Sequence, residues 1–115
     1  MLIRSQDKRM IVNFDNICTV SAFLEKDSED IYVEDGTGSL MVGRYSTKEK
    51  AMKVLDMIQE AYGDSEYTKY VIPEVCRILS MKPKTEENKA HAGELGEMLK
   101  KGMTFQMPED SEVVV

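Results

Sequence analysis

Few of the residue types that commonly carry chemistry occur in this chain of 115 residues, which has 2 cysteines, 1 histidine and no tryptophan. Cys18 and Cys76 lie far apart and form no Cys-x-x-Cys motif. A structural zinc site takes about four Cys or His ligands at close spacing, which these residues and His91 cannot supply. We therefore expect no metal site and no cofactor, and we interpret both cysteines as small buried apolar side chains. A disulfide between them is disfavoured in a reducing compartment.

Long hydrophobic runs are absent as well. No apolar stretch approaches the roughly 18 residues of a membrane-spanning helix, and Met1–Met10 lacks the apolar stretch of about 7–15 residues found in secretory signals. We therefore expect a cytoplasmic protein without a membrane partner. The length fits a single domain of residues 1–115, because domains commonly contain about 100–150 residues. The apolar share of 42% argues against a disordered chain.

Clusters of basic residues are also missing, and the formal net charge is −6. Binding to a phosphate backbone through counterion release requires several clustered Lys or Arg side chains, so we expect no direct contact with nucleic acid. The acidity is concentrated in one segment, in which the base Lys26 stands among Glu25, Asp27, Glu29, Asp30, Glu34 and Asp35. We interpret this segment as a solvated hairpin loop. The alternatives are a weak divalent-cation site and a surface that mimics nucleic-acid phosphate.

An alternation of apolar and polar residues predicts strands in the first half of the chain and near its end. These predicted strands cover about 2–5, 10–14, 18–24, 31–33, 40–45 and 103–107. Between two of them, the segment Glu34–Gly38 is typical of a hairpin turn. Because the connections are short, we expect an antiparallel β-meander of four to five strands that the last strand joins.

The apolar period becomes helical at Ser46. Ser46 and Glu49, three residues later, fit a capping box, in which each side chain accepts a hydrogen bond from a free amide at the helix start. Gly63 would end this helix as a left-handed C-cap. The predicted helix, about 47–62, gathers its apolar residues on one face, which consists of Ala51, Val54, Leu55, Ile58 and Tyr62.

The patterns in 64–102 are weaker. Pro73 fits the first turn of a helix with one apolar face, consisting of Ile72, Val75, Cys76 and Leu79. A strand over 70–72 is the alternative, because the residue before a proline prefers extended backbone. A further helix is predicted over 86–101.

These elements predict an α+β fold, in which the helix of about 47–62 packs on one face of the meander and one or two extra helices come from 64–102. The predicted core consists of Ile3, Val12, Phe14, Val20, Ile31, Val33, Leu40, Val42, Val54, Leu55, Ile58 and Phe105.

Three stretches of the chain carry a resemblance to known proteins: they read IRSQDKRMIVNFDNI, VGRYSTKEKAMKVLDMIQEAY and FQMPEDSEV. In these stretches the chain resembles a group of small uncharacterised proteins of low-GC Gram-positive bacteria and their prophages or mobile elements. The resemblance covers about 2–63 and 103–113, so we interpret 64–102 as a candidate insertion, and 109–115 as a candidate flexible tail. The group has no assigned activity, so the resemblance implies an intracellular, phage-associated setting and no mechanism.

No motif in the chain predicts a reaction, and we predict no catalytic residue. An enzyme that uses His91, paired with a cysteine, is a minor alternative. The 9 methionines suit irregular cores and also adaptable contact surfaces, as do Tyr67 and Tyr70. We therefore predict a non-enzymatic accessory domain that acts through protein–protein contact or self-association, with an apolar surface on 64–81 or 98–107. The alternative from another class is an acidic inhibitor that occupies the nucleic-acid site of a DNA-handling protein.

Overall fold

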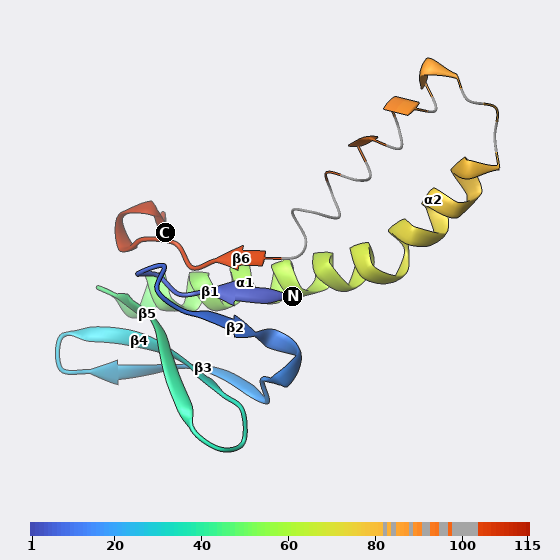
Figure 1. The fold of residues 1–115 in the computed structure, drawn as a ribbon. Helices are drawn as coiled ribbons and strands as arrows, with labels where there is room; N and C mark the ends of the chain where they lie inside the picture. Colours follow the sequence, from blue (N-terminus) through green and yellow to red (C-terminus); the bar gives the residue numbers. More distant parts are fainter. Residues whose placement is uncertain (82, 84, 88, 91–92, 95–96, 98–103) are drawn as a thin grey trace.

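The chain folds into two three-stranded sheets and one long bent helix (Figure 1). The computed structural model describes residues 1–115 except 82, 84, 88, 91–92, 95–96 and 98–103. The mixed sheet has the strand order β2-β1-β6, and its strands are β1 (Leu2–Arg4), β2 (Ile11–Asn13) and β6 (Thr104–Gln106). The meander sheet has the order β3-β4-β5, with β3 (Thr19–Glu25), β4 (Ser28–Glu34) and β5 (Ser39–Tyr45). The helical elements are η1 (Phe14–Asn16), α1 (Lys48–Tyr70), α2 (Ile72–Ser80) and η2 (Asp110–Glu112).

The predicted α+β class is confirmed, but the prediction of one antiparallel sheet of four to five strands is wrong. Only β3, β4 and β5 form the meander. The 3-10 turn η1 redirects the chain after β2, which pairs with β1 instead of β3. The predicted last strand exists as β6, but it pairs in parallel with β1. A parallel pair needs a long crossover, and here most of the chain lies between its two strands.

Gln6 joins the two sheets immediately after β1. Its backbone amide donates to the carbonyl of Val42 at 2.8 Å. Its side chain accepts from the amide of Arg44 at 2.9 Å and donates to the carbonyls of Arg44 and Pro108 at 3.0 and 3.2 Å. One glutamine therefore satisfies backbone groups of β5 that a neighbouring strand would otherwise pair with.

The core lies between the two sheets and α1, which contacts all three strands of the meander sheet. Most of the predicted core is confirmed: Ile3, Val12, Ile31, Val33, Val42, Val54 and Ile58 are buried, and Phe14, Val20, Leu55 and Phe105 are partly buried against them. Leu40 was expected there, but it is 47% exposed because it lies beside the turn of the β4–β5 hairpin. Tyr45, Met107 and Val113 belong to the core although the sequence pattern did not select them.

A β-bulge brings the end of β5 close to the C-terminal segment. The register shifts between Ile31 and Tyr32, so Val42 and Gly43 both lie inside. A Cβ on Gly43 would stand 3.0 Å from the terminal methyl of Met107 and 3.0 Å from the ring of Tyr45. Because Gly43 has no side chain, Met107 and Tyr45 can pack directly against the backbone of β5.

The start and the end of α1 both differ from the prediction. Thr47, not Ser46, is the N-cap, and its hydroxyl accepts from the amide of Lys50 at 3.2 Å. Ser46 is engaged elsewhere, because its amide and hydroxyl donate to the carboxylate of Asp110 at 2.8 and 3.1 Å. Gly63 does not end the helix, which continues to Tyr70. A glycine permits a left-handed cap but does not require one.

The helix bends at Pro73, within the predicted first turn of α2. The amide of Val71 donates to Tyr67 and that of Val75 to Val71, so helical bonding continues from α1 into α2. Pro73 has no amide hydrogen to donate, which explains the bend. The helix predicted at Pro73 is confirmed, and the alternative strand over 70–72 is wrong. We call residues 64–81 the arm. In Figure 1 its α2 part stands away from both sheets.

The arm makes the protein elongated. The Cα radius of gyration is 17.4 Å, compared with about 13 Å for a compact domain of this length. The described positions between 86 and 97 are helical, but the predicted helix over 86–101 falls largely outside the described residues. Among the helices of the described part, none has the length and apolar content that crossing a lipid bilayer requires.

The C-terminal segment, a candidate flexible tail by sequence, contains the short 3-10 helix η2. Glu109 and Glu112 form a reciprocal capping box around η2, and Val113 is buried. Lys50 donates to the carbonyl of Asp110 at 2.9 Å and anchors the segment to the start of α1.

Candidate interaction surface

The arm carries a row of exposed apolar and aromatic side chains. Their exposed fractions range from 37% to 71%. We call this row the exposed stripe, and its members are Tyr67, Tyr70, Val71, Ile78 and Met81. At 3.6 residues per turn, all five fall within about 100° of the helix circumference. They therefore form one strip along the arm, which Glu74 interrupts between Val71 and Ile78.

The opposite face of the arm is the less exposed one. Ser65, Thr68 and Ile72 are buried there, and Val75 and Leu79 are partly buried. The arm is thus apolar on two sides, and only one of them is covered. A helix whose only role is to stabilise the fold is expected to have polar side chains on the face that points to solvent.

The area of the exposed stripe can be compared with that of protein interfaces. A large side chain offers about 150–200 Å², so the exposed fractions leave on the order of 500 Å² of apolar and aromatic surface open to solvent. A standard interface buries about 800 Å² on each partner, of which about 450 Å² is apolar. The exposed stripe is therefore large enough to form the centre of a specific contact.

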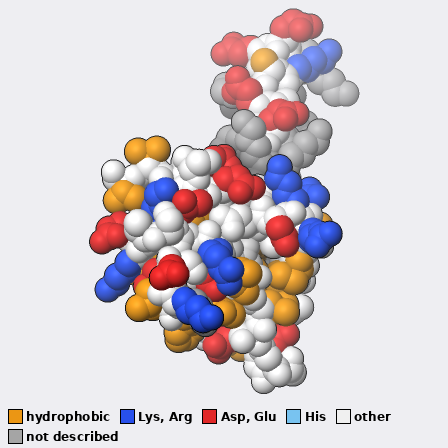
Figure 2. Space-filling view, turned by 90° about the vertical axis from the view of Figure 1, so that its left-hand side faces the viewer, with side chains coloured by type: hydrophobic (Ala, Val, Ile, Leu, Met, Phe, Trp, Pro, Cys, Tyr) orange, Lys and Arg blue, Asp and Glu red, His pale blue; other side chains and the backbone are white. Residues whose placement is uncertain are grey.

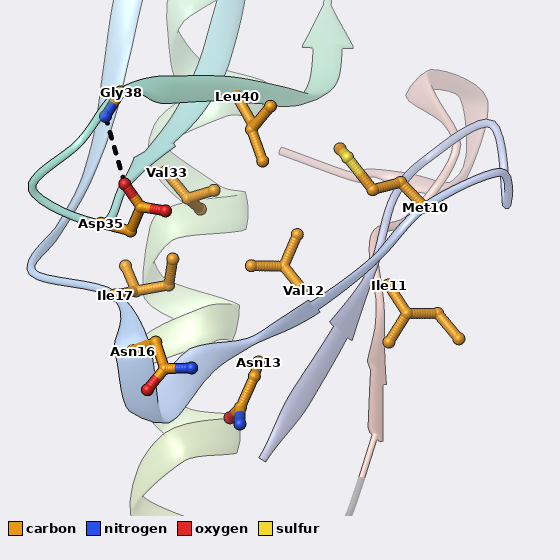
Figure 3. A pocket seen from close by; sticks show the side chains of 10 residues that line it. All are labelled: Met10, Ile11, Val12, Asn13, Asn16, Ile17, Val33, Asp35, Gly38 and Leu40. Carbon is orange, nitrogen blue, oxygen red and sulfur yellow. Dashed lines mark hydrogen bonds between the residues drawn. The ribbon is translucent and has the colours of Figure 1, made fainter.

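A second apolar feature is a groove of about 230 Å³ between β2 and the β4–β5 hairpin (Figure 3). Val12 and Val33 form its floor, and Met10, Ile17 and Leu40 line its sides. Asn13, Asn16 and Asp35 contribute its polar edge. The volume is below the range of about 300–1,000 Å³ that is typical of small-molecule sites.

The only carboxylate among the lining residues of this groove is engaged in the hairpin turn. Asp35 accepts from the hydroxyl of Thr37 at 2.7 Å, from its amide at 2.9 Å and from the amide of Gly38 at 3.1 Å. These hydrogen bonds hold the pKa of Asp35 below its usual value. Gly36 adopts the positive φ of 92° that the turn requires. The predicted hairpin turn is confirmed, and Asp35 serves it rather than a ligand.

The acidic segment does not form one exposed surface. Asp30 is fully buried, and both its oxygens accept from the guanidinium of Arg44, at 3.0 and 3.1 Å. The hydrogen bond from Arg44 is the main reason that the pKa of Asp30 lies below its usual value. Glu29 is nearly buried as well, whereas Asp27 is exposed. Figure 2 shows acidic and basic side chains interspersed over one face of the body. This arrangement gives little support to phosphate mimicry, which requires exposed carboxylates.

Of the residues considered for catalysis, the structure describes the two cysteines. Cys18 is exposed, so its interpretation as a buried apolar residue is wrong; it precedes β3, an edge strand of the meander sheet. Cys76 is partly buried on α2, and both thiols are free. His91 lies outside the described residues. Among those that are described, no three His, Cys, Asp or Glu side chains are grouped as metal ligands would be.

The sequence located part of the exposed stripe. Tyr67 and Tyr70 were named as contact residues within 64–81, and both are exposed. Ile78 and Met81 lie in the same predicted range but were not named, because the apolar pattern of α2 pointed only to the less exposed face. Their spacing from Val71, seven and ten residues, was the available signal. The other predicted contact region, 98–107, lies mostly outside the described residues.

Comparison with known proteins found no matching family model, and neither a curated protein nor a solved structure matches the chain.

Proposed function

We propose that this chain is a non-enzymatic accessory domain that acts through protein–protein contact, and that the exposed stripe is its contact surface. The observation that carries the proposal is the stripe itself, about 500 Å² of apolar and aromatic surface on an arm that projects from the body. Tyrosine is enriched at the energetically dominant positions of interfaces, and Tyr67 and Tyr70 supply that chemistry here. The sequence resemblance adds the expectation of an intracellular, phage-associated setting.

The proposal can be tested by photo-crosslinking in bacterial cells. In the test variant, a photoreactive phenylalanine derivative replaces Tyr70 in the exposed stripe. In the control variant it replaces Phe23 on β3, a side chain that is 51% exposed. Both replacements exchange one exposed aromatic ring for another. We expect a discrete cross-linked protein from position 70 and none of that mass from position 23. If position 70 gives no discrete adduct, or if both positions give the same one, the exposed stripe is not the contact surface.

A further inference from the structure

We infer that the partner of the exposed stripe is a second copy of this chain, with the two arms packed antiparallel around Glu74. The inference rests on the proposed function, since it names the partner of the same surface. It follows from the order of side chains along the stripe, from the charges at its centre and from its area.

The exposed stripe is complementary to itself when it is reversed. Tyr67 and Met81 are each seven residues from Glu74, and Tyr70 and Ile78 are each four residues from it. A two-fold axis at Glu74 therefore places the two tyrosines of one arm against Met81 and Ile78 of the other, whereas Val71 faces Arg77. Tyr67 meets Met81 of the second copy, in the sulfur–aromatic contact that methionine favours. In a parallel arrangement, each side chain would face the same side chain of the second copy, and the tyrosines would not meet Met81 and Ile78.

The charged residues at the centre are compatible with the same axis. Within one arm, the guanidinium of Arg77 donates from Nε to Glu74 at 3.0 Å, and both side chains are more than half exposed. Across the axis, Glu74 faces Glu74 of the second copy, and Arg77 faces its Val71. Each carboxylate is already paired with the guanidinium of its own arm, so the axis brings together two ion pairs, and this pairing reduces the repulsion between the two glutamates.

The area of the contact agrees with that of a stable dimer. The stripe spans about 21 Å of helix, from Tyr67 to Met81. Its roughly 500 Å² of apolar surface matches the apolar share of one side of a standard interface. Two identical stripes therefore supply the apolar centre of a symmetric interface, and polar side chains beside them, Glu74 and Arg77 among them, contribute the remaining area.

Analytical ultracentrifugation of the full chain over about 1–200 µM tests the inference. We expect a monomer–dimer equilibrium with a dimer of twice 13.1 kDa. Ile78→Asp places a carboxylate in the exposed stripe and should raise the dimer dissociation constant at least about tenfold. The matched control is Leu24→Asp, because Leu24 is an exposed leucine on β3, outside the arm, and it should leave the constant unchanged. Circular dichroism confirms that both variants are folded.

Charge exchange tests the antiparallel axis specifically. Glu74→Arg leaves two positive charges at the centre of each arm, and Arg77→Glu leaves two negative charges. Each variant alone should be monomeric, and an equimolar mixture should form heterodimers. A mixture that stays monomeric while the unsubstituted chain dimerises would overturn the axis at Glu74.

The outcomes separate this inference from the proposed function. If the unsubstituted chain stays monomeric to 200 µM, or if Ile78→Asp dimerises as well as Leu24→Asp, the second copy is not the partner. A cross-link from position 70 to a different protein would then retain the contact role and reject self-association. The absence of both a dimer and a cross-linked protein would reject the two together.

Discussion

The buried ion pair between Asp30 and Arg44 allows a quantitative test of the fold. Asp30→Asn keeps the shape of the side chain but removes its charge and places an amide donor against the guanidinium donors of Arg44. Hydrogen bonds to charged groups stabilise proteins by about 1.5–3 kcal/mol each, and breaking a buried ion pair costs about 3–5 kcal/mol. Arg44 is 61% exposed and remains hydrated, so we expect a loss near the lower end, about 2 kcal/mol. For a domain of this size that corresponds to a decrease in Tm of about 8 °C.

The same variant should change how stability depends on pH. The pKa of Asp30 in the folded protein is lowered, chiefly by the hydrogen bond from Arg44 and against the effect of burial. Its ionised form therefore stabilises the fold above the unfolded pKa of about 3.9, and this contribution is lost as the pH falls through the folded pKa. The difference in free energy of unfolding between the natural chain and Asp30→Asn should be largest near pH 7 and should shrink below pH 4.

Urea unfolding at pH 7 and pH 3, followed by circular dichroism, measures both effects. Asp27→Asn is the control, because it removes an exposed carboxylate from the same hairpin and should change stability by less than about 0.5 kcal/mol. The reasoning is refuted if Asp30→Asn is as stable as Asp27→Asn at pH 7. It is also refuted if the loss caused by Asp30→Asn is the same at both pH values.

Three further substitutions test the packing around β5, each by its free energy of unfolding in urea. Gly43→Ala should cost about 1–3 kcal/mol, because the new methyl group would stand 3.0 Å from both Met107 and the ring of Tyr45; an unchanged stability would contradict that close approach. Tyr45→Phe removes the hydroxyl that donates to the carbonyl of Pro108 at 2.8 Å, and should cost about 1 kcal/mol. A loss above about 3 kcal/mol would mean that the hydroxyl has a further role. Asp110→Asn should cost less than about 1 kcal/mol, since this carboxylate is 40% exposed, and the loss should diminish in high salt.

The local elements of the fold were accessible from the sequence because the residues that define them are neighbours in the chain. The hairpin turn needs a residue of positive φ between two alternating segments, and Gly36 provides it. Pro73 marked the start of α2, because its ring is compatible with the first turn of a helix. Ala51, Val54 and Ile58 identified the buried face of α1 through their helical spacing.

The positions at which prediction failed depend on contacts between distant segments. Ser46 and Thr47 are both suitable N-caps, and the carboxylate of Asp110 decides between them by binding Ser46. Leu40 and Val42 follow the same alternation. Leu40 lies beside the hairpin turn and is exposed, whereas Val42 lies at the bulge and is buried.

The sequence alone determined the strands, the turn, the two helical segments and the α+β class, because these follow from short-range sterics and from the periodicity of apolar residues. Tertiary structure decided how the strands divide into two sheets, that β6 pairs in parallel with β1, and that Gln6 joins the sheets. It also decided which apolar face of the arm is covered. Periodicity indicates that a helix has apolar faces, but a face is exposed or buried only according to which distant part of the chain packs against it. That choice is what leaves the exposed stripe available for contact.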